Sequence, residues 1–231
     1  MNTEQTHTPQ CIGFIMDGNR RWASSRGMST LEGHAQGYEA FKKMIDAVYR
    51  AHVPHMVCYA FSTENWRRTE EEVGYLMELM SRALRELGET LNTDTRNINL
   101  RVIGEKKRLP ENIQKEILAI ESRNHEHPEL TVWVAISYGG RAEVIDAVNR
   151  IVQKGEEVTE ESFGQFLWTH GMPDPDLIIR TSGELRTSNF LIWQSAYSEL
   201  FFTDTLWPDF GETEFQSIVE QYKTRQRRKG A

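Results

Sequence analysis

Apolar residues along this chain gather into short uninterrupted runs that turn residues separate. Runs of this length are typical of strands that are buried on both faces of a sheet. Six of them predict strands, at residues 11–16, 56–61, 98–103, 130–136, 177–179 and 199–202.

Between these runs, apolar residues recur every three or four positions, which predicts helices with one buried face. The longest stripe extends from Val73 to Leu91, and Thr69 with Glu72 forms a capping box before it. Pro110 is expected to start another helix, and Thr159 to cap a short one. Further stripes lie at residues 41–48, 144–151 and 215–222. The segment from Asp17 to His34 is expected to be a loop.

Strands and helices alternate along the whole chain, without internal repeats or a low-complexity linker. This alternation predicts an α/β fold with a mostly parallel six-stranded sheet flanked by helices, in a single domain over residues 1–231. Residues 1–10 are polar and are expected to be disordered. They do not resemble a signal peptide, and no segment approaches the roughly 18 apolar residues of a membrane span. We therefore expect a cytoplasmic protein.

Four predicted strands end in polar, mostly glycine-containing segments. The carboxyl ends of parallel strands meet at one edge of a sheet, where open α/β folds bind their ligands. We therefore expect a pocket built from residues 17–19, 62–68, 137–141 and 180–184.

The first of these segments combines a carboxylate, a glycine, an amide and two adjacent guanidinium groups. Gly18 permits a sharp turn, Asp17 and Asn19 can orient a substrate or metal, and the arginines suit phosphate oxygens. This pattern predicts an anion site beside a carboxylate able to bind a metal. The alternative is an ordinary loop in which Asp17 caps the next helix and Arg20 and Arg21 are solvated.

The net charge of −7 argues against general nucleic-acid binding. Many arginines nevertheless lie near turn-rich segments, which favours bidentate recognition of phosphate or carboxylate. They are Arg20, Arg21, Arg26, Arg67, Arg68, Arg180 and Arg186. A second basic cluster, at residues 225–229, is either a solvated helix end or a functional tail.

Four carboxylates near the predicted pocket are available to a hard cation: Asp17, Glu64, Glu184 and Glu199. Magnesium bound by one or two carboxylates together with substrate phosphates fits this set. The chain has neither a P-loop nor a dinucleotide-binding motif, and no convincing nucleophile motif. Electrostatic catalysis on phosphorylated substrates is the simplest scheme.

Histidine and cysteine contribute little further chemistry. His52, His55 and Cys58 are spaced like a zinc half-site, but no second pair follows, so we assign them structural roles. Cys11 and Cys58 are expected to be small buried hydrophobic residues. His34 follows a glycine near the Asp17 segment, where it either donates to a phosphate, relays a proton, or caps a helix.

Six ordered motifs give the chain a close resemblance to the cis-prenyltransferases. They cover residues 16–23, 33–34, 59–66, 138–141, 179–184 and 188–204. The resemblance implies condensation of isopentenyl diphosphate onto an allylic diphosphate such as farnesyl diphosphate, with release of diphosphate. It also implies Mg²⁺ as cofactor and a homodimer of parallel-sheet α/β subunits.

The resemblance assigns roles to individual residues. Asp17 would hold Mg²⁺ and assist departure of the allylic diphosphate, Asn65 would help to remove the proton, and Glu199 would add a metal ligand from the partner region of the dimer. The tail at 228–230 resembles a segment that reaches the neighbouring subunit's substrate. The residues implied to bind substrate are Gly18, Asn19, Arg20, Arg21, Trp22, Arg26, His34, Ser62, Thr63, Glu64, Trp66, Arg68, Arg180, Arg186, Thr187 and Ser188.

Three positions depart from the family pattern: Arg20, Thr30 and Ser137. Many relatives have glycine, arginine and asparagine at these positions. Arg20 or Arg26 is the candidate to compensate for Thr30. These departures concern allylic diphosphate binding and leave the reaction type unchanged.

A growing isoprenoid needs an apolar channel. The stripe at 73–91, Ala60 and the strand at 132–136 are candidate lining, although the same residues also serve as ordinary core. Small Ala60 leaves room for a long chain, whereas Trp133 would narrow the channel, and we favour a long product of the undecaprenyl type. Its release would involve transient membrane contact.

Alternatives are a shorter-chain synthase and a non-catalytic prenyltransferase-like subunit. Because the chain keeps Asp17, Glu199, Arg180 and Arg186, the sequence favours an enzyme over such a subunit. A trans-prenyltransferase is disfavoured, since no D-D-x-x-D motif occurs and the strand pattern conflicts with an all-helical fold.

Overall fold

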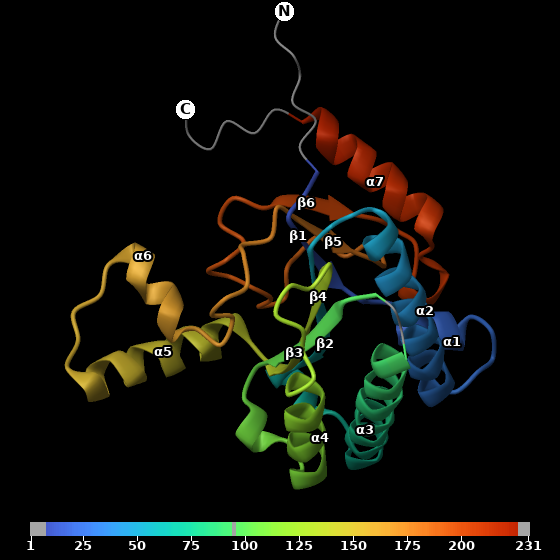
Figure 1. Ribbon diagram of the computed structural model, residues 1–231. Helices are drawn as coiled ribbons and strands as arrows, with labels where there is room; N and C mark the ends of the chain where they lie inside the picture. Colours follow the sequence, from blue (N-terminus) through green and yellow to red (C-terminus); the bar gives the residue numbers. More distant parts are fainter. Residues whose placement is uncertain (1–7, 94–95, 226–231) are drawn as a thin grey trace, which may run out of the picture.

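The computed structural model describes residues 8–93 and 96–225, and in this part of the chain six strands form one sheet with every pairing parallel (Figure 1). The order is β3-β4-β2-β1-β5-β6. This confirms the predicted six-stranded sheet, and each predicted strand matches to within two residues. The strands are β1 Cys11–Ile15, β2 His55–Ser62, β3 Ile98–Ile103, β4 Leu130–Tyr138, β5 Leu177–Arg180 and β6 Glu199–Phe202.

Helices fill most of the connections between strands. They are α1 Asn19–Ser24, α2 Thr30–Arg50, α3 Glu70–Thr93, α4 Glu111–Glu121, α5 Gly140–Lys154, α6 Glu160–Phe163 and α7 Glu212–Thr224, with short 3₁₀ turns η1 Thr63–Arg67, η2 Lys106–Arg108, η3 Gly164–Phe166 and η4 Trp207–Asp209. The prediction of a loop from Asp17 to His34 is wrong, because α1 and the start of α2 lie there. Asp17 does not cap α1 either, since the N-cap residue is Gly18, at φ +108°.

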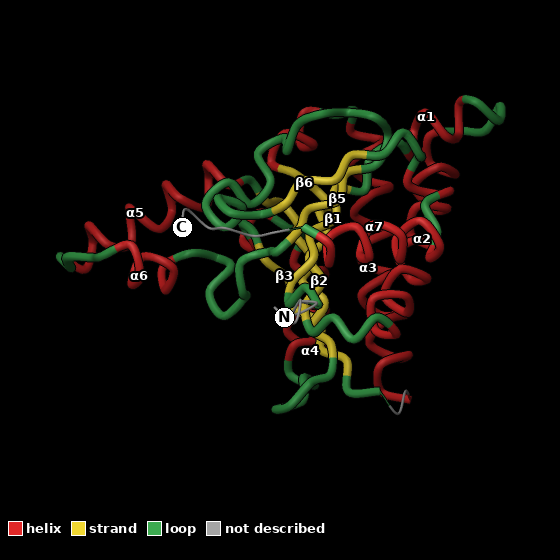
Figure 2. Tube along the Cα trace, turned by 90° about the horizontal axis from the view of Figure 1, so that it is seen from above, coloured by secondary structure: helices red, strands yellow, loops and turns green. Residues whose placement is uncertain are grey.

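The larger core lies between one face of the sheet and α2, α3, α4 and α7, and Phe14, Met44, Ile113 and Phe215 are almost fully buried in it. Figure 2 shows α2, α3 and α7 on one side of the sheet and α5 and α6 on the other.

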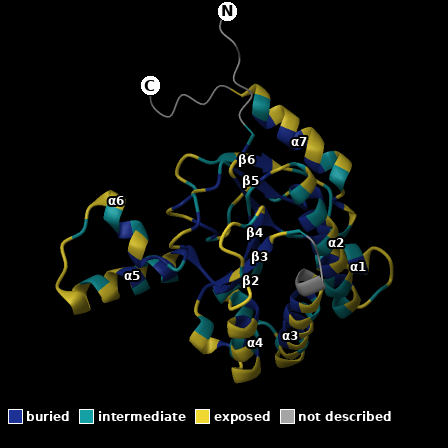
Figure 3. Cartoon of the chain, in the orientation of Figure 1, coloured by how far each residue is buried: buried dark blue, intermediate teal, exposed yellow. Residues whose placement is uncertain are grey.

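The second face of the sheet is covered differently. Met172, Phe190 and Leu191, from the connections around β5, pack on it, while α5 and α6 form a small core of their own around Ala147 and Phe163. Figure 3 shows that the outer sides of α5 and α6 are exposed whereas the strands are buried. The predicted sheet flanked by helices is therefore confirmed, with the connections around β5 lying between the second face and α5 and α6.

The sheet order reverses at β1, which has β2 on one side and β5 on the other. In open parallel sheets such a reversal opens a crevice beyond the carboxyl ends of the strands. Asp17 follows the end of β1, so the topology places its carboxylate at this crevice.

The chain ends bear on two expectations. Residues 1–10 were predicted to be disordered, but residues 1–7 lie outside the described residues. The tail at 226–231 also lies outside them. Pro9 is buried and the Gln10 backbone N–H donates to Asp176 at 2.5 Å, so the expectation is wrong for these two residues. No helix in the described part of the chain is both long and apolar enough to cross a bilayer.

Gly33 lets α2 approach α1 closely, because a Cβ atom at this position would lie 2.3 Å from the carbonyl oxygen of Asn19. Gly33→Ala should therefore lower the free energy of unfolding by about 1–3 kcal/mol, as backbone atoms must move to admit the methyl group. Gly74→Ala is the matched control, because Gly74 also lies in a helix but its Cβ would meet open space. That change should raise the free energy of unfolding by up to about 1 kcal/mol. Urea denaturation measures both, and equal effects would contradict this account.

Candidate functional site

An ion pair between Asp17 and Arg180 lies at the centre of the crevice. Arg180 pairs with Ile15 in the sheet register, two residues before Asp17, and its Nη2 donates to Asp17 Oδ2 at 2.7 Å. Its Nη1 donates to Ser188 Oγ at 2.7 Å and to the carbonyl of Arg186 at 2.6 Å. The Arg180 side chain is only 5% exposed, and its Nε has no partner among the described residues. The loops after β1 and β5 are thus joined through one buried cation with a donor to spare.

Asp17 is ionised at neutral pH. Burial alone would raise its pKa, but the hydrogen bond and charge of Arg180, with smaller contributions from Ser182 and the Gly18 amide, lower the pKa below its usual value. The side chain remains 34% exposed, and its Oδ1 lies 4.0 Å from Nη2 of Arg21. One carboxylate oxygen is therefore bound to Arg180 while the other can accept a cation or orient a polar ligand.

A first polar pocket of about 540 Å³ lies on the α1 side of Asp17. Three guanidinium groups suited to phosphate line it. Its lining residues are Met16, Asp17, Gly18, Asn19, Arg20, Arg21, Ser24, Thr30, His34 and Arg68.

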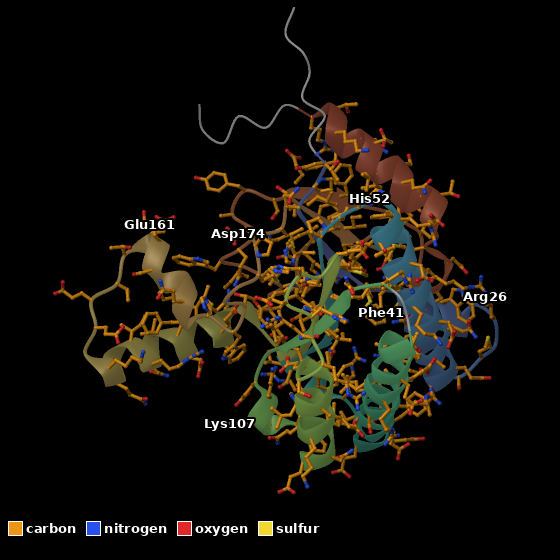
Figure 4. All side chains as sticks on the ribbon, viewed as in Figure 1. Arg26, Phe41, His52, Lys107, Glu161 and Asp174 are labelled. Carbon is orange, nitrogen blue, oxygen red and sulfur yellow. The ribbon has the colours of Figure 1, made fainter. Side chains whose placement is uncertain are left out.

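This pocket decides which arginine can compensate for Thr30. Arg20 lines the pocket together with Thr30. Arg26 instead donates to Asp209 at 3.0 Å and lies over the ring of Trp22 at 4.3 Å, and Figure 4 shows it on the outer loop beyond α1. Arg20 is therefore the candidate that remains.

A second polar pocket, also of about 540 Å³, lies on the other side of Asp17. It is lined by Ile15, Met16, Asp17, Tyr59, Ser62, Glu64, Asn65, Arg68, Arg180, Ser188 and Asn189. Within it, Asn65 and Ser62 form a capping box, in which the backbone N–H of Ser62 donates to Asn65 Oδ1 at 3.1 Å. The oxygen through which Asn65 would accept a proton is thus already a hydrogen-bond acceptor.

An apolar cavity of about 120 Å³ opens between α2, α3 and the sheet. Its lining includes the predicted Ala60, Val134 and Ile136 and much of the α3 stripe. Helix α2 also contributes to the lining, which was not predicted, and its Phe41 faces this space (Figure 4). The idea that Trp133 narrows the channel is wrong, because Trp133 packs on the opposite face of the sheet.

The three cavities meet at shared residues. The apolar cavity shares Met16, Asn19 and His34 with the first polar pocket, and it shares Met16 and Tyr59 with the second. Met16 lines all three, and sequence reasoning gave it no role. Two polar pockets lined by guanidinium groups therefore flank Asp17, with an apolar cavity opening beside them.

His34 lies where the apolar cavity joins the first polar pocket, in contact with Glu72 of α3. His34 Nε2 and Glu72 Oε1 are 3.2 Å apart, and Arg68 Nη1 donates to the same oxygen at 2.8 Å. Only one of the two hydrogen bonds of the predicted capping box therefore forms. The Glu72 N–H donates to Thr69 Oγ1 at 3.3 Å, but the Glu72 carboxylate binds His34 and Arg68. Since Ser29 caps α2, the helix-capping role for His34 is wrong.

Several residues predicted to bind substrate do not line these cavities. Trp66 packs edge-on against Phe61, and its indole N–H donates to Ser137 Oγ at 3.0 Å. The Arg186 guanidinium pairs with Glu184 and is largely exposed, although the Arg186 carbonyl contacts Arg180. The others outside the linings are Trp22, Arg26, Thr63 and Thr187.

Within one chain, the two predicted metal ligands lie at opposite ends of the strands: Glu199 at the amino ends and Asp17 at the carboxyl ends. Glu199 pairs with Leu177 at the start of the strands and accepts a hydrogen bond from Arg225, whereas Asp17 follows the end of β1. In the described residues no three His, Cys, Asp or Glu side chains converge as a metal site, the His52, His55 and Cys58 set included. Asp17 is thus the predicted metal ligand present in this crevice.

The His34 contacts predict its titration. Burial lowers its pKa below the usual 6.5, Glu72 opposes this, and Arg68 adds to it. The unfolded chain therefore binds this proton at higher pH than the folded chain, so the free energy of unfolding should fall as pH drops below about 6.5. Glu72→Gln should lower the His34 pKa further, since it removes the group that raises it. NMR of the imidazole checks this, and Glu71→Gln, at an exposed neighbouring position, should leave the titration unchanged. A higher His34 pKa in Glu72→Gln would contradict the assignment.

Comparisons with known proteins agree with this geometry. Residues 15–230 match the prenyltransferase family model described as "Putative undecaprenyl diphosphate synthase". An isoprenyl transferase of Fusobacterium nucleatum is 45% identical over 227 residues, which cover 98% of this chain and 97% of that protein. A ditrans,polycis-undecaprenyl-diphosphate synthase ((2E,6E)-farnesyl-diphosphate specific) of Legionella pneumophila is 42% identical, covering 96% of this chain and 95% of the relative.

A solved structure supports the same grouping. The crystal structure of lavandulyl diphosphate synthase from Lavandula x intermedia, in complex with dimethylallyl diphosphate, superposes with a TM-score of 0.92 at 34% identity. The match covers 97% of this chain and 99% of that one. From the pockets around Asp17, the family match over residues 15–230 and these relatives, we conclude that the chain belongs to the cis-prenyltransferase family.

Proposed function

We propose that this protein condenses isopentenyl diphosphate with an allylic diphosphate, farnesyl diphosphate by preference, to make a long-chain polyprenyl diphosphate. The observation that carries the proposal is that two polar pockets share Asp17 and that one apolar cavity adjoins both of them at Met16. Such a junction suits two diphosphate groups and one isoprenoid tail. The carbon atoms that react would then lie between the pockets.

The allylic diphosphate fits the first polar pocket, and the isopentenyl diphosphate fits the second. Asn19, Arg20, Arg21 and His34 surround the first group, with the prenyl tail in the adjoining apolar cavity. Arg180, whose Nε donor is buried and unpaired among the described residues, would bind the second group with Ser188. This arrangement directs the allylic carbon toward the isopentenyl double bond.

The reaction breaks the allylic C–O bond, forms a C–C bond and releases one proton from the isopentenyl unit. Negative charge grows on the departing diphosphate, so fixed guanidinium groups stabilise the transition state more than the ground state. Arg20, Arg21 and Arg68 are positioned for this. Catalysis therefore needs no covalent intermediate with the protein.

Asp17 is also suited to hold Mg²⁺. Its carboxylate is ionised, partly exposed and adjacent to the first polar pocket, and Mg²⁺ prefers one or two carboxylates completed by phosphate oxygens and water. When bound, Mg²⁺ supplies positive charge that offsets the charge growing on the leaving diphosphate.

We also propose a homodimer. Large apolar side chains are exposed around α5 and the edge strand β6, and monomers rarely leave many of these uncovered. They are Ile145, Val148, Val152, Leu185, Ile192, Trp193, Tyr197, Leu200 and Phe202. A second copy covering this surface would explain them, and it would bring Glu199 toward the partner's active site as the resemblance implies. A cytoplasmic location and transient membrane contact remain predictions from the sequence.

The proposed long product requires the apolar cavity to enlarge. At about 120 Å³ it is similar to the roughly 150 Å³ engineered cavity that accommodates benzene. Its walls on α3 include Met80 and Leu84, and methionine adapts its shape readily. A long chain must therefore displace side chains of α2 and α3 as it grows.

Incorporation of labelled isopentenyl diphosphate onto farnesyl diphosphate tests the activity. The protein should be active with Mg²⁺ and inactive after chelation, and Asp17→Ala should lose at least about a hundredfold in turnover while remaining folded. Glu220→Ala, which removes an exposed carboxylate on α7, is the control and should retain activity. Near-normal incorporation by Asp17→Ala would refute the proposed role, and a wild-type protein without incorporation would favour the non-catalytic subunit.

Product length tests the apolar cavity. Ala60→Leu adds bulk to the cavity wall and should shorten the product made from farnesyl diphosphate. Trp133→Phe alters the opposite face of the sheet and should leave the length unchanged. Mass spectrometry of the products measures both, and a full-length product from Ala60→Leu would show that the chain grows elsewhere.

A further inference from the structure

Asn189 lines the second polar pocket and lies where three segments of the chain meet. Its Nδ2 donates to Glu64 Oε1 at 3.0 Å, its Oδ1 accepts from the backbone N–H of Arg141 at 2.9 Å, and its carbonyl accepts from Gly140 N–H at 2.8 Å. One residue thus joins η1, the start of α5 and the loop after β5.

Asn189 also supplies the cap that α5 lacks within its own segment. The first N–H groups of a helix have no partner inside the helix, and the N-cap residue Gly139 has no side chain to accept from them. The carbonyl and side-chain oxygens of Asn189 bind the first two N–H groups, those of Gly140 and Arg141.

The backbone around Asn189 is shaped for this role. Ser188 and Asn189 have φ values of +50° and +66°, in the left-handed region that asparagine tolerates better than most residues. A Cβ atom on Gly139 would lie 2.8 Å from Asn189 Nδ2, and one on Gly140 would lie 3.2 Å from its carbonyl oxygen. The two glycines therefore make room for this residue.

Ser188, the residue before Asn189, is held in place by Arg180 and Tyr59. Arg180 donates to its hydroxyl at 2.7 Å, and the Tyr59 hydroxyl donates to its carbonyl at 3.4 Å. Asn189 thus connects Ser188 and Arg180 on one wall of the pocket with Glu64 on another.

We propose that Asn189 is the positioning residue of the second polar pocket, holding Ser188 and Glu64 at the spacing that the diphosphate of isopentenyl diphosphate requires. This inference rests on the proposed function and assigns Asn189 to one of its two substrates. Its effect should therefore fall on isopentenyl diphosphate and spare the allylic partner.

Asn189→Gly is the sharpest test, because glycine keeps the left-handed backbone while removing both side-chain hydrogen bonds. The KM for isopentenyl diphosphate should rise about tenfold, and the KM for farnesyl diphosphate should change less than about twofold. Asn189→Ala should be worse, since it adds backbone strain. An unchanged KM for isopentenyl diphosphate in Asn189→Gly, or an equal rise for both substrates, would overturn the proposal.

His52→Ala is the matched control for the backbone. His52 is also left-handed, at φ +53°, but it lies in the turn after α2, at the opposite edge of the sheet (Figure 4). This variant should leave both KM values within about twofold of wild type. A comparable rise in KM for isopentenyl diphosphate would show that the Asn189 effect is a general loss of stability.

A double-mutant cycle tests the contact with Glu64. Asn189→Asp places a second carboxylate beside Glu64 and removes the donor. Combining it with Glu64→Gln restores the hydrogen bond in the opposite direction, with the glutamine amide donating to the aspartate carboxylate. The double variant should have a lower KM for isopentenyl diphosphate than the product of the single effects predicts, by about fivefold or more. Additive effects would overturn the role of this contact.

Amide hydrogen exchange in the substrate-free protein separates this inference from the proposed function. Asn189→Gly should speed exchange at the Arg141 N–H about tenfold, because that group loses its acceptor. If wild type forms no product, the proposed function fails while this measurement stands. Unchanged exchange at Arg141 would refute the capping contact whatever the activity.

Discussion

The ion pair between Asp17 and Arg180 is the interaction on which the crevice depends. A guanidinium group that is 95% buried is stable only if its charge is balanced and most of its donors are bound. Asp17 balances the charge of Arg180 and binds its Nη2, while Ser188 and the Arg186 carbonyl bind its Nη1. The pair exists because β1 and β5 are neighbours in the sheet, with Ile15 opposite Arg180. The order of the strands thus determines which carboxylate meets which guanidinium group.

The loops around this pair adopt unusual backbone conformations. Six described residues other than glycine have positive φ, and five of them lie at the end of β4 or in the connection after β5: Ser137, Ser182, Ser188, Asn189 and Leu191. Such conformations cost energy and persist where the surrounding structure enforces them, commonly at functional sites. Here hydrogen bonds between loops supply the enforcement, so the pockets are already shaped before a ligand binds.

The sequence predicted the sheet, the carboxyl-edge crevice and Asp17 because these follow from apolar periodicity and from where polar residues interrupt it. It did not predict which way Trp133 points, because β4 is buried on both faces and its apolar pattern is the same for either orientation. The prediction of a capping box at Thr69 was correct for one of its two hydrogen bonds. The Glu72 carboxylate, which would have made the other bond, contacts His34 instead. Local patterns thus located the site, whereas the direction of Trp66, Arg26 and Glu72 depended on contacts distant in the sequence.

The apolar cavity and the first polar pocket are linked through the same pair of helices. The walls of the apolar cavity come largely from α2 and α3. A hydrogen bond between His34 and Glu72 at the mouth and an ion pair between Lys42 and Glu86 farther along connect these helices. A product longer than the present cavity can hold must push against these contacts, and His34 and Arg68 also line the first polar pocket. A chain growing in this cavity would therefore press on residues that we propose to bind the allylic diphosphate, and this would relate product length to diphosphate release.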